Sequence, residues 1–197
     1  MQEKTEVKER IIAATTELIE QSEGDVECIT ARAIAERANV CLGLINYHFG
    51  CKENLITVCV QRIICHVVAG MEMAQDCGSD RQRLTIWATH VFDFLFEHSA
   101  ISRLSILGDL RNYTEDCNSV RTQRGFVRSM TEDVDEADRP FAAFVLTAAM
   151  QAAFLGRDAA QAVLGYDFAR PEDRRAYIER LVNGLFDGCG RRADGCE

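Results

Sequence analysis

Proline is nearly absent from this sequence, which contains only Pro140 and Pro171 among 197 residues. Proline inside a helix removes a backbone hydrogen bond and clashes with the preceding turn, so a chain with so little of it can form long helices. Apolar residues make up 47% of the chain, which is enough for a sizeable core, and they recur at helical spacing. These features predict an all-α protein.

Long apolar runs are also missing. The richest stretch, Leu55 to Met71, is interrupted by Gln61, Arg62 and His66 and is too broken for a membrane span. The first ten residues, MQEKTEVKER, are charged and hold no apolar signal core. We therefore expect a cytoplasmic protein.

Paired cysteine motifs are absent although cysteine itself is common. None of the nine cysteines has the C-x-x-C spacing of zinc knuckles or redox pairs, and their odd number does not suit a disulfide framework. We expect no metal site and no cofactor, with most thiols acting as small core residues. No nucleophile–base arrangement, phosphate loop or paired carboxylates indicates an enzyme.

The first fifty residues predict three helices. Val7, Ile11, Ala14 and Leu18 form one apolar face of a helix over residues 5–21. Thr30 is a suitable N-cap for a second helix over 31–38, and Asn39 can adopt the left-handed conformation that ends it. A third short helix follows over 42–48, with Ile45 and Phe49 as buried anchors. Two short helices joined by a tight turn and packed on a longer one form a helix-turn-helix head.

The remaining residues predict a larger helical body. Helical spacing indicates segments over 52–75, 81–97, 101–110 and 117–134, then one that Pro140 opens and a last one that Pro171 opens. With the head this makes about nine helices. We place the domain boundary between residues 51 and 52, so that the head covers 1–51 and the body 52–197.

The string TARAIAERANVCLGLINYHFGCKENLI, residues 30–56, resembles the DNA-binding signature of the tetracycline-repressor (TetR) family. The matching residues are Thr30, Ile34, Ala35, Ala38, Val40, Gly43, Ile45, His48, Phe49, Lys52, Glu53 and Leu55.

The net charge of −9 opposes indiscriminate nucleic-acid binding. Residues 28–52, however, carry Arg32, Arg37 and Lys52 against Glu36 alone. A locally basic head on an acidic body suits selective binding of double-stranded operator DNA.

The resemblance implies two groups of DNA-binding residues. The backbone would be held by Thr30, Tyr47, His48 and Lys52, because hydroxyl, imidazole and ammonium groups and helix N-termini suit phosphates. The base sequence would be read by Arg32, Leu42, Gly43, Leu44 and Asn46.

The sequence departs from the family signature at several positions. Asn39 replaces a usual glycine, Cys41 and Cys51 replace serines, and Asn46 replaces an aromatic residue. Leu42 and Leu44 occupy places that are often polar or small. If these leucines face the groove, part of the readout is apolar, through thymine methyl groups.

The resemblance also implies a body that binds a small molecule and forms a homodimer. The protein would be a repressor released from a palindromic operator by an apolar or aromatic effector. Candidate pocket residues are His66, Trp87, His90, Phe94, His98, Tyr113, Met150 and Phe154. The predicted dimer interface uses the last two helices, through Phe141, Phe144, Val145, Ala148, Ala152, Ile178, Leu181, Val182 and Leu185.

Two other interpretations remain open at this point. Cys41 and Cys51 flank the third helix, so their oxidation would make a thiol-responsive regulator. A helical metal- or thiol-binding protein without DNA binding would use Cys59, Cys65, His66, His90 and His98, although their spacing fits no established zinc pattern.

Overall fold

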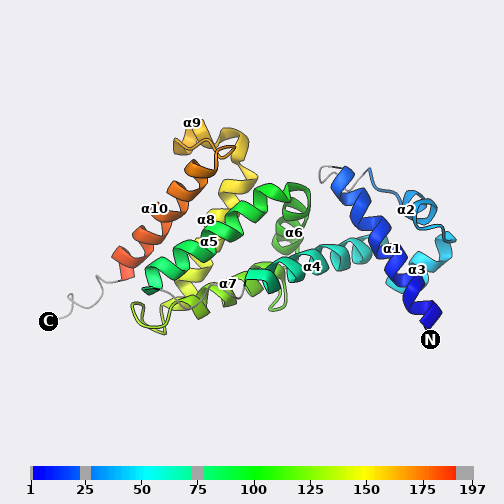
Figure 1. Ribbon diagram of the computed structural model, residues 1–197, viewed down its shortest axis with the longest axis horizontal. Helices are drawn as coiled ribbons and strands as arrows, with labels where there is room; N and C mark the ends of the chain where they lie inside the picture. The colour runs from blue at the N-terminus through cyan, green and yellow to red at the C-terminus, as the bar shows by residue number, and fades with distance from the viewer. Residues whose placement is uncertain (1, 23–27, 72–77, 190–197) are drawn as a thin grey trace. The chain divides into compact units, whose positions relative to one another are not determined.

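The computed structural model describes residues 2–22, 28–71 and 78–189, with side chains over 5–22, 28–62 and 78–188. The described residues form ten α-helices and contain no strand, as the all-α prediction requires. The chain divides into two compact units (Figure 1). The first comprises Met1–Gly70 with His98–Arg111, and the second Met71–Glu97 with Asn112–Glu197. The predicted boundary after residue 51 does not coincide with this division.

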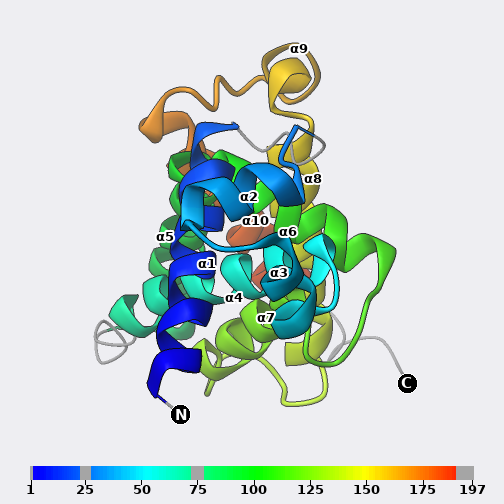
Figure 2. The same cartoon turned by 90° about the vertical axis from the view of Figure 1, so that its right-hand side faces the viewer.

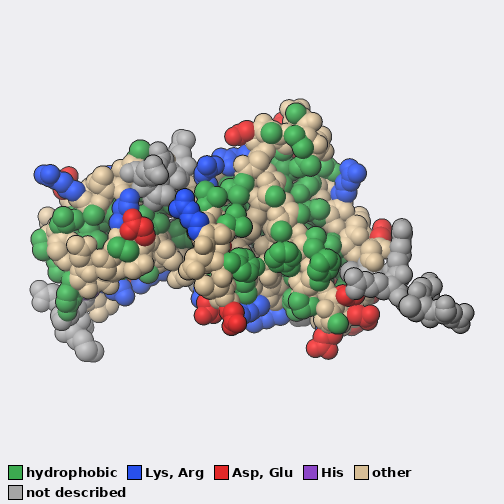
Figure 3. All heavy atoms as spheres, turned by 180° about the vertical axis from the view of Figure 1, so that it is seen from behind, with side chains coloured by type: hydrophobic (Ala, Val, Ile, Leu, Met, Phe, Trp, Pro, Cys, Tyr) green, Lys and Arg blue, Asp and Glu red, His purple; other side chains and the backbone are tan. Residues whose placement is uncertain are grey.

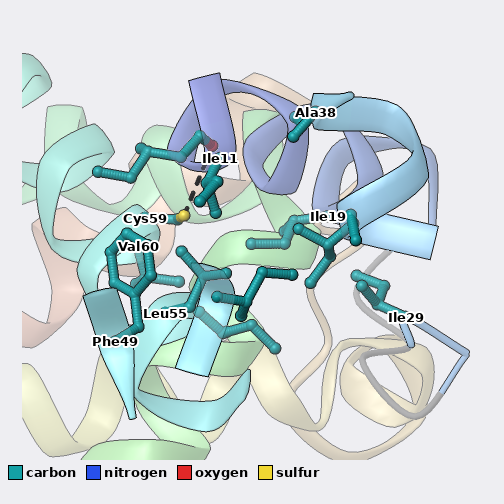
Figure 4. Packing of buried hydrophobic residues seen from close by; sticks show 14 of the residues in the cluster. Ile11, Ile19, Ile29, Ala38, Phe49, Leu55, Cys59 and Val60 are labelled. Carbon is teal, nitrogen blue, oxygen red and sulfur yellow. Dashed lines mark hydrogen bonds between the residues drawn. The ribbon is translucent and has the colours of Figure 1, made fainter. Parts of the chain in front are cut away.

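The first unit contains α1 (Gln2–Gln21), α2 (Ala31–Ala38), α3 (Leu42–Phe49), most of α4 (Lys52–Met71) and α6 (Ser99–Arg111). All five helices contribute to one core, which includes Ile11, Ile34, Ile45, Leu55 and Ile101. Figure 4 shows part of this core, with Ile11 and Leu55 among the labelled residues. Each fully buried isoleucine or leucine stabilises the fold by about 1.5–3 kcal/mol. The start of α4 belongs to this unit because Leu55, Ile56, Cys59 and Val60 are buried in the same core.

A hydrogen bond and an ion pair join α1 to α4. The Cys59 thiol donates to the carbonyl of Ile12 over 3.6 Å, and burial raises the pKa of this thiol to about 11. On the surface the Arg62 guanidinium bonds both oxygens of Glu9, with Nη2 at 2.8 Å from Oε1, and this contact lowers the pKa of Glu9. Both side chains are about half exposed, so the pair adds little stability.

The second unit contains α5 (Asp80–Glu97), α7 (Asn118–Ser129), α8 (Arg139–Leu155), a 3₁₀ turn η2 (Arg157–Ala159), α9 (Ala160–Leu164) and α10 (Pro171–Cys189). α10 lies along α5, and α7 packs against α8. In Figure 2, α5 and α8 lie on opposite sides of this unit. The short α9 and η2 lie between the two helices that Pro140 and Pro171 were expected to open, where no helix was predicted.

The predicted helix over 117–134 ends early in the structure, and Asp80 provides the reason. The Asp80 carboxylate is 1% exposed and accepts backbone N–H groups from Thr131, Glu132 and Asp133 at 2.7, 2.7 and 2.8 Å. These N–H groups belong to a turn wrapped around the carboxylate, so they are withdrawn from helix bonding. Burial opposes the charge of Asp80, but these hydrogen bonds outweigh it and lower the pKa.

Aromatic side chains and a partly buried ion pair pack together at the other end of this unit. Phe92 contacts Phe96, Phe168 and Tyr177, with ring centroids 5.1–5.5 Å apart. Beside them Arg174 donates to Asp93 at 2.6 Å and to the carbonyl of Phe168 at 3.0 Å. These contacts hold the loop before α10 against α5.

The search for membrane spans covered the described residues. No single helix there has both the length and the apolar character to cross a bilayer. One pair of helical segments, Arg139–Leu155 and Arg157–Leu164, meets the criteria of length and composition together, with a bend of 76° between them.

Candidate nucleic-acid interface

The start of α2 is fixed by Thr30. Its backbone is extended (φ −94°, ψ 150°), and its hydroxyl oxygen accepts the Ala33 N–H at 3.1 Å. This is the geometry of a threonine N-cap, which satisfies one of the free N–H groups of the first helical turn. Thr30 is exposed, so the capped N-terminus of α2 faces solvent.

The turn between α2 and α3 depends on Asn39. Its φ of 52° and ψ of 54° place it in the left-handed region, as predicted, and no other non-glycine residue in the described chain has a positive φ. Asn39 N–H donates to Glu36 and Val40 N–H to Ala35, over 3.2 and 3.0 Å. These bonds satisfy carbonyls at the end of α2 in a Schellman arrangement. Asparagine tolerates this conformation, so the turn forms without the glycine that the family favours.

α3 has a buried side and an exposed side. Ile45 is completely buried and Phe49 is 8% exposed, and both belong to the core of the first unit. Tyr47 is 67% exposed and Leu42 is 48% exposed. Gly43 and Asn46 are exposed as well. The two anchors therefore fix α3 on the unit while a row of side chains remains on its outer surface.

Leu42 and Leu44, which the sequence treats alike, have different surroundings. Leu44 is partly buried and packs against the core of the first unit. Leu42 is exposed and takes no part in that core. His48 is also partly buried, and its ring lies edge-on to Tyr47 with centroids 5.1 Å apart. Of the residues on α3 that were predicted to contact bases, Leu42, Gly43 and Asn46 are therefore exposed, whereas Leu44 packs against the core.

Gly43 has no steric reason within this chain to be glycine. A Cβ built at Gly43 meets no heavy atom within 4 Å, and its φ is not positive. Glycine lowers helix stability by roughly 0.5–1 kcal/mol relative to alanine. The fold therefore tolerates a side chain here, and the missing one leaves bare backbone on the outer surface.

The loop into α4 requires glycine at position 50. Gly50 has a φ of +78°, and its N–H donates to the Asn46 carbonyl at 2.9 Å. Lys52 then begins α4 and is partly exposed. The neighbouring Glu53 carboxylate accepts its own backbone N–H and a hydrogen bond from the Cys51 side chain, which lowers the pKa of Glu53. An acidic side chain thus shares this helix N-terminus with Lys52.

The two arginines of α2 form ion pairs. Arg32 donates to Glu36 one turn later, over 3.2 Å, and its side chain is 86% exposed. Arg37 donates to Glu17 and Gln21 on α1, over 3.0 and 3.2 Å. Exposed pairs of this kind are weak, so Arg32 can exchange Glu36 for another partner. The i,i+4 spacing of Arg32 and Glu36 is a signal from which the sequence could have indicated this pair.

The candidate pocket residues of the second unit are not equivalent. Phe154 and Met150 are buried on α8, and Phe94 is 8% exposed. Tyr113 is 50% exposed and accepts a hydrogen bond from Gln123, and His90 is exposed. His98 begins the second segment of the first unit. The side chain of His66 lies outside the described residues. A shared pocket for these residues remains a prediction.

Trp87 differs from the other pocket candidates. Its indole nitrogen is buried and has no hydrogen-bond partner among the described residues. A Cβ built at Gly125 of α7 lies only 3.1 Å from this nitrogen, so Gly125 lets α7 approach the indole closely. A buried N–H without an acceptor is costly, by about 1–3 kcal/mol.

Four residues of the predicted dimer interface lie on one exposed apolar side of α8. Phe141 is 61% exposed, Phe144 is 50% exposed, and Ala148 and Ala152 continue the same exposed side. Figure 3 views the second unit from the α8 side and shows hydrophobic side chains gathered there. Three other predicted interface residues are partly exposed: Val145 on α8, and Leu181 and Leu185 on α10.

Two residues predicted for the dimer interface are core residues instead. Ile178 and Val182 are both 0% exposed within the single chain. The reason is that α10 packs along α5 of the same chain, which takes up the face that carries them. The sequence shows the apolar stripe of α10 but not which helix covers it.

The structure describes the side chains of five of the nine cysteines. Cys59 and Cys117 are buried, Cys51 is partly exposed, and Cys28 and Cys41 are exposed. The prediction that most thiols act as core residues therefore holds for two of the five described side chains. Cys41 has the extended backbone of an N-cap before α3 but makes no side-chain capping bond. Within the described part of the chain no group of three His, Cys, Asp or Glu side chains is placed to hold a metal ion, and Cys65 and His66 lie outside the described side chains.

Comparisons with known proteins place this geometry among solved structures. The chain is similar to a TetR transcriptional regulator from Rhodococcus sp. RHA1, with a TM-score of 0.62, 17% identity and 93% and 97% of the two chains covered. It is also similar to a second transcriptional regulator from Rhodococcus sp. RHA1, with a TM-score of 0.66, 16% identity and 92% and 96% covered. No protein-family model and no curated protein sequence matches the chain. The all-helical arrangement, with a helix-turn-helix close to the N-terminus, is the fold of TetR-type transcriptional regulators.

Proposed function

We propose that this protein is a DNA-binding transcriptional regulator of the TetR type. The carrying observation is α3, which Ile45 and Phe49 anchor on one side and which presents Leu42, Asn46 and Tyr47 to solvent on the other. A short helix of this kind after a tight turn inserts into the major groove of B-DNA. The likeness in fold to solved regulators supports this proposal.

Backbone contacts would surround this helix. The capped N-terminus of α2 at Thr30 and the N-terminus of α4 at Lys52 both offer N–H groups to phosphates. The exposed Tyr47 hydroxyl adds a donor. Because phosphate contacts release counterions, their loss lowers the salt dependence of binding.

The proposal is tested by selecting duplexes from a random-sequence library with the full-length protein and measuring affinity by fluorescence anisotropy. Lys52→Ala is expected to weaken binding to all sequences and to lower the salt slope by about 1. Arg111→Ala, at an exposed arginine on α6, is the control and should leave both unchanged. Failure to enrich any duplex above bulk DNA would reject the proposal.

We further propose that the protein acts as a homodimer through α8 and α10. The exposed stripe on α8 that holds Phe141 and Phe144 supports this, because large contiguous apolar surfaces mark interaction sites. A two-fold dimer would read a palindromic operator with half-sites about 34–36 Å apart. Leu181 and Leu185 would contribute from α10, while Ile178 and Val182 support that helix from the core.

Regulation by a small molecule completes the proposal, with the protein acting as a repressor. The buried Trp87 N–H without an acceptor supports a ligand that brings one, such as a planar aromatic compound with a carbonyl or carboxylate. Such a ligand would favour a dimer whose two reading helices no longer match the operator.

The single tryptophan of the sequence makes this testable. A panel of aromatic carboxylates and ketones is screened for a change in tryptophan fluorescence and for release of a selected duplex. A compound that changes both is expected, and Trp87→Phe should lower its affinity. A panel that alters fluorescence without releasing DNA would contradict the release mechanism.

A further inference from the structure

The outer surface of α3 lacks the side chains that proteins most often use to read guanine. Leu42–Phe49 contains no arginine or lysine and no carboxylate. Arginine and lysine recognise guanine through its O6 and N7 atoms, and carboxylates accept from the cytosine amino group. A G·C pair facing α3 would therefore find few charged partners.

With Tyr47 assigned to a phosphate, Leu42, Gly43 and Asn46 are the exposed residues of α3 that remain for contacts with base edges. Leu42 is 48% exposed at the first position of α3, and Asn46 is exposed one turn later. Positions i and i+4 lie on one side of a helix, so these two side chains share a strip of the surface. Leucine suits the methyl group of thymine, and asparagine suits the N6 and N7 atoms of adenine. Both preferences select A·T pairs.

Gly43 provides an independent observation. The fold leaves open space where its Cβ would lie, so packing within the chain does not explain the glycine. Bare backbone beside Leu42 lets the first turn of α3 come close to a partner. The first turn is also the part of a reading helix that contacts base edges.

We infer that α3 reads an A·T-rich half-site, with Leu42 against a thymine methyl group and Asn46 against an adenine. This inference rests on the proposed DNA-binding function and adds to it the chemistry of the operator. Leu44 has no part in it, because its side chain packs against the core of the first unit. The sequence treats the two leucines alike, and the structure assigns the reading role to Leu42 alone.

The test starts from the duplex enriched by the full-length protein from a random library. Each thymine in turn is replaced by deoxyuridine, which lacks only the C5 methyl group. One replacement in each half-site is expected to weaken binding by about threefold to fivefold, the effect of one buried methyl group. Replacing one adenine in turn by 7-deazaadenine should weaken binding at the position that Asn46 reads.

Variants assign each effect to its residue. Leu42→Ala should bind thymine and deoxyuridine duplexes equally well, and Asn46→Ala should lose its sensitivity to 7-deazaadenine. Leu110→Ala is the matched control, because Leu110 is an exposed leucine of the same unit on α6. It should retain the full thymine-to-deoxyuridine difference.

The possible outcomes separate the two proposals. If no duplex is enriched, DNA binding itself is rejected. If a duplex is enriched but its critical positions are G·C pairs, or no deoxyuridine replacement weakens binding, the inference is overturned while DNA binding stands. A deoxyuridine effect of the same size in Leu42→Ala would overturn the assignment to Leu42.

Discussion

Substitution of Gly43 by alanine should stabilise the fold and weaken DNA binding at the same time. The added methyl group meets no heavy atom of the chain within 4 Å, so it introduces no clash. Alanine also restricts the unfolded chain and favours the helix. The same methyl group would project from the outer surface of α3, where the proposed partner approaches.

The magnitudes follow from these two environments. Gly43 lies at the second position of an eight-residue helix, so the gain in free energy of unfolding should be about 0.5 kcal/mol, at the low end of the usual range. A methyl group inserted into a well-packed contact costs about 1–3 kcal/mol. Because 1.4 kcal/mol corresponds to a factor of ten, DNA affinity should fall by about tenfold.

Chemical unfolding followed by circular dichroism measures the first effect, and anisotropy with a selected duplex measures the second. Gly108→Ala is the matched control, since Gly108 is an exposed helical glycine of the same unit whose added Cβ also meets nothing. It should be stabilised without any loss of affinity. Unchanged DNA affinity in Gly43→Ala would refute the close approach of α3 to DNA. A lower free energy of unfolding in this variant would refute the inference that the fold has room for a side chain at position 43.

Four further predictions concern single side chains. Thr30→Ala should lower the free energy of unfolding by about 1 kcal/mol through loss of the N-cap, whereas Thr30→Ser should retain it, as measured by urea unfolding. Cys41→Ser should raise the free energy of unfolding by about 0.5–1 kcal/mol, because serine can supply the missing side-chain cap of α3. If peroxide still abolishes operator binding in this variant, Cys41 is excluded as a redox switch. Asp80→Asn should lower the free energy of unfolding by about 2–4 kcal/mol, because it weakens the hydrogen bonds that the buried carboxylate accepts. Because the folded pKa of Asp80 is lowered, its stabilisation is complete above the ordinary value of 3.8 and is lost as the pH falls through the folded pKa, so acid unfolding should be less steep in the variant. Phe144→Glu should convert the dimer into a monomer, as measured by light scattering. The control Val163→Glu, at a 75% exposed valine on α9, should remain dimeric. A dimeric Phe144→Glu variant would contradict the α8 interface.

Local patterns were sufficient to predict the head. The predicted helix over 31–38 and the left-handed turn at Asn39 are both confirmed, and the predicted helix over 42–48 is one residue short of α3. Each depends on contacts within a few residues: the Thr30 cap, the backbone bonds of Asn39 and Val40, and the apolar spacing of Ile45 and Phe49. Short-range contacts leave their signal in short stretches of sequence, so these elements could be read without a structure.

Long-range contacts explain what the sequence did not show. The helix predicted over 117–134 is cut short because Asp80, fifty-one residues before Thr131, binds the turn that follows it. Ile178 and Val182 show the same periodic spacing as Leu181 and Leu185, and the position of α5 decides which of them are buried. Periodicity identifies an apolar face but not the element that covers it.

The sequence by itself determined that the chain is helical, where the helix-turn-helix lies and which residues are candidates for DNA contact. Only the tertiary structure separated Leu42 from Leu44, because both are leucines of the same short helix and differ in what packs against them. It also showed that Gly43 is not required by the fold and that the Trp87 N–H has no acceptor among the described residues. These are properties of the space around a side chain, which depends on residues far away in the sequence.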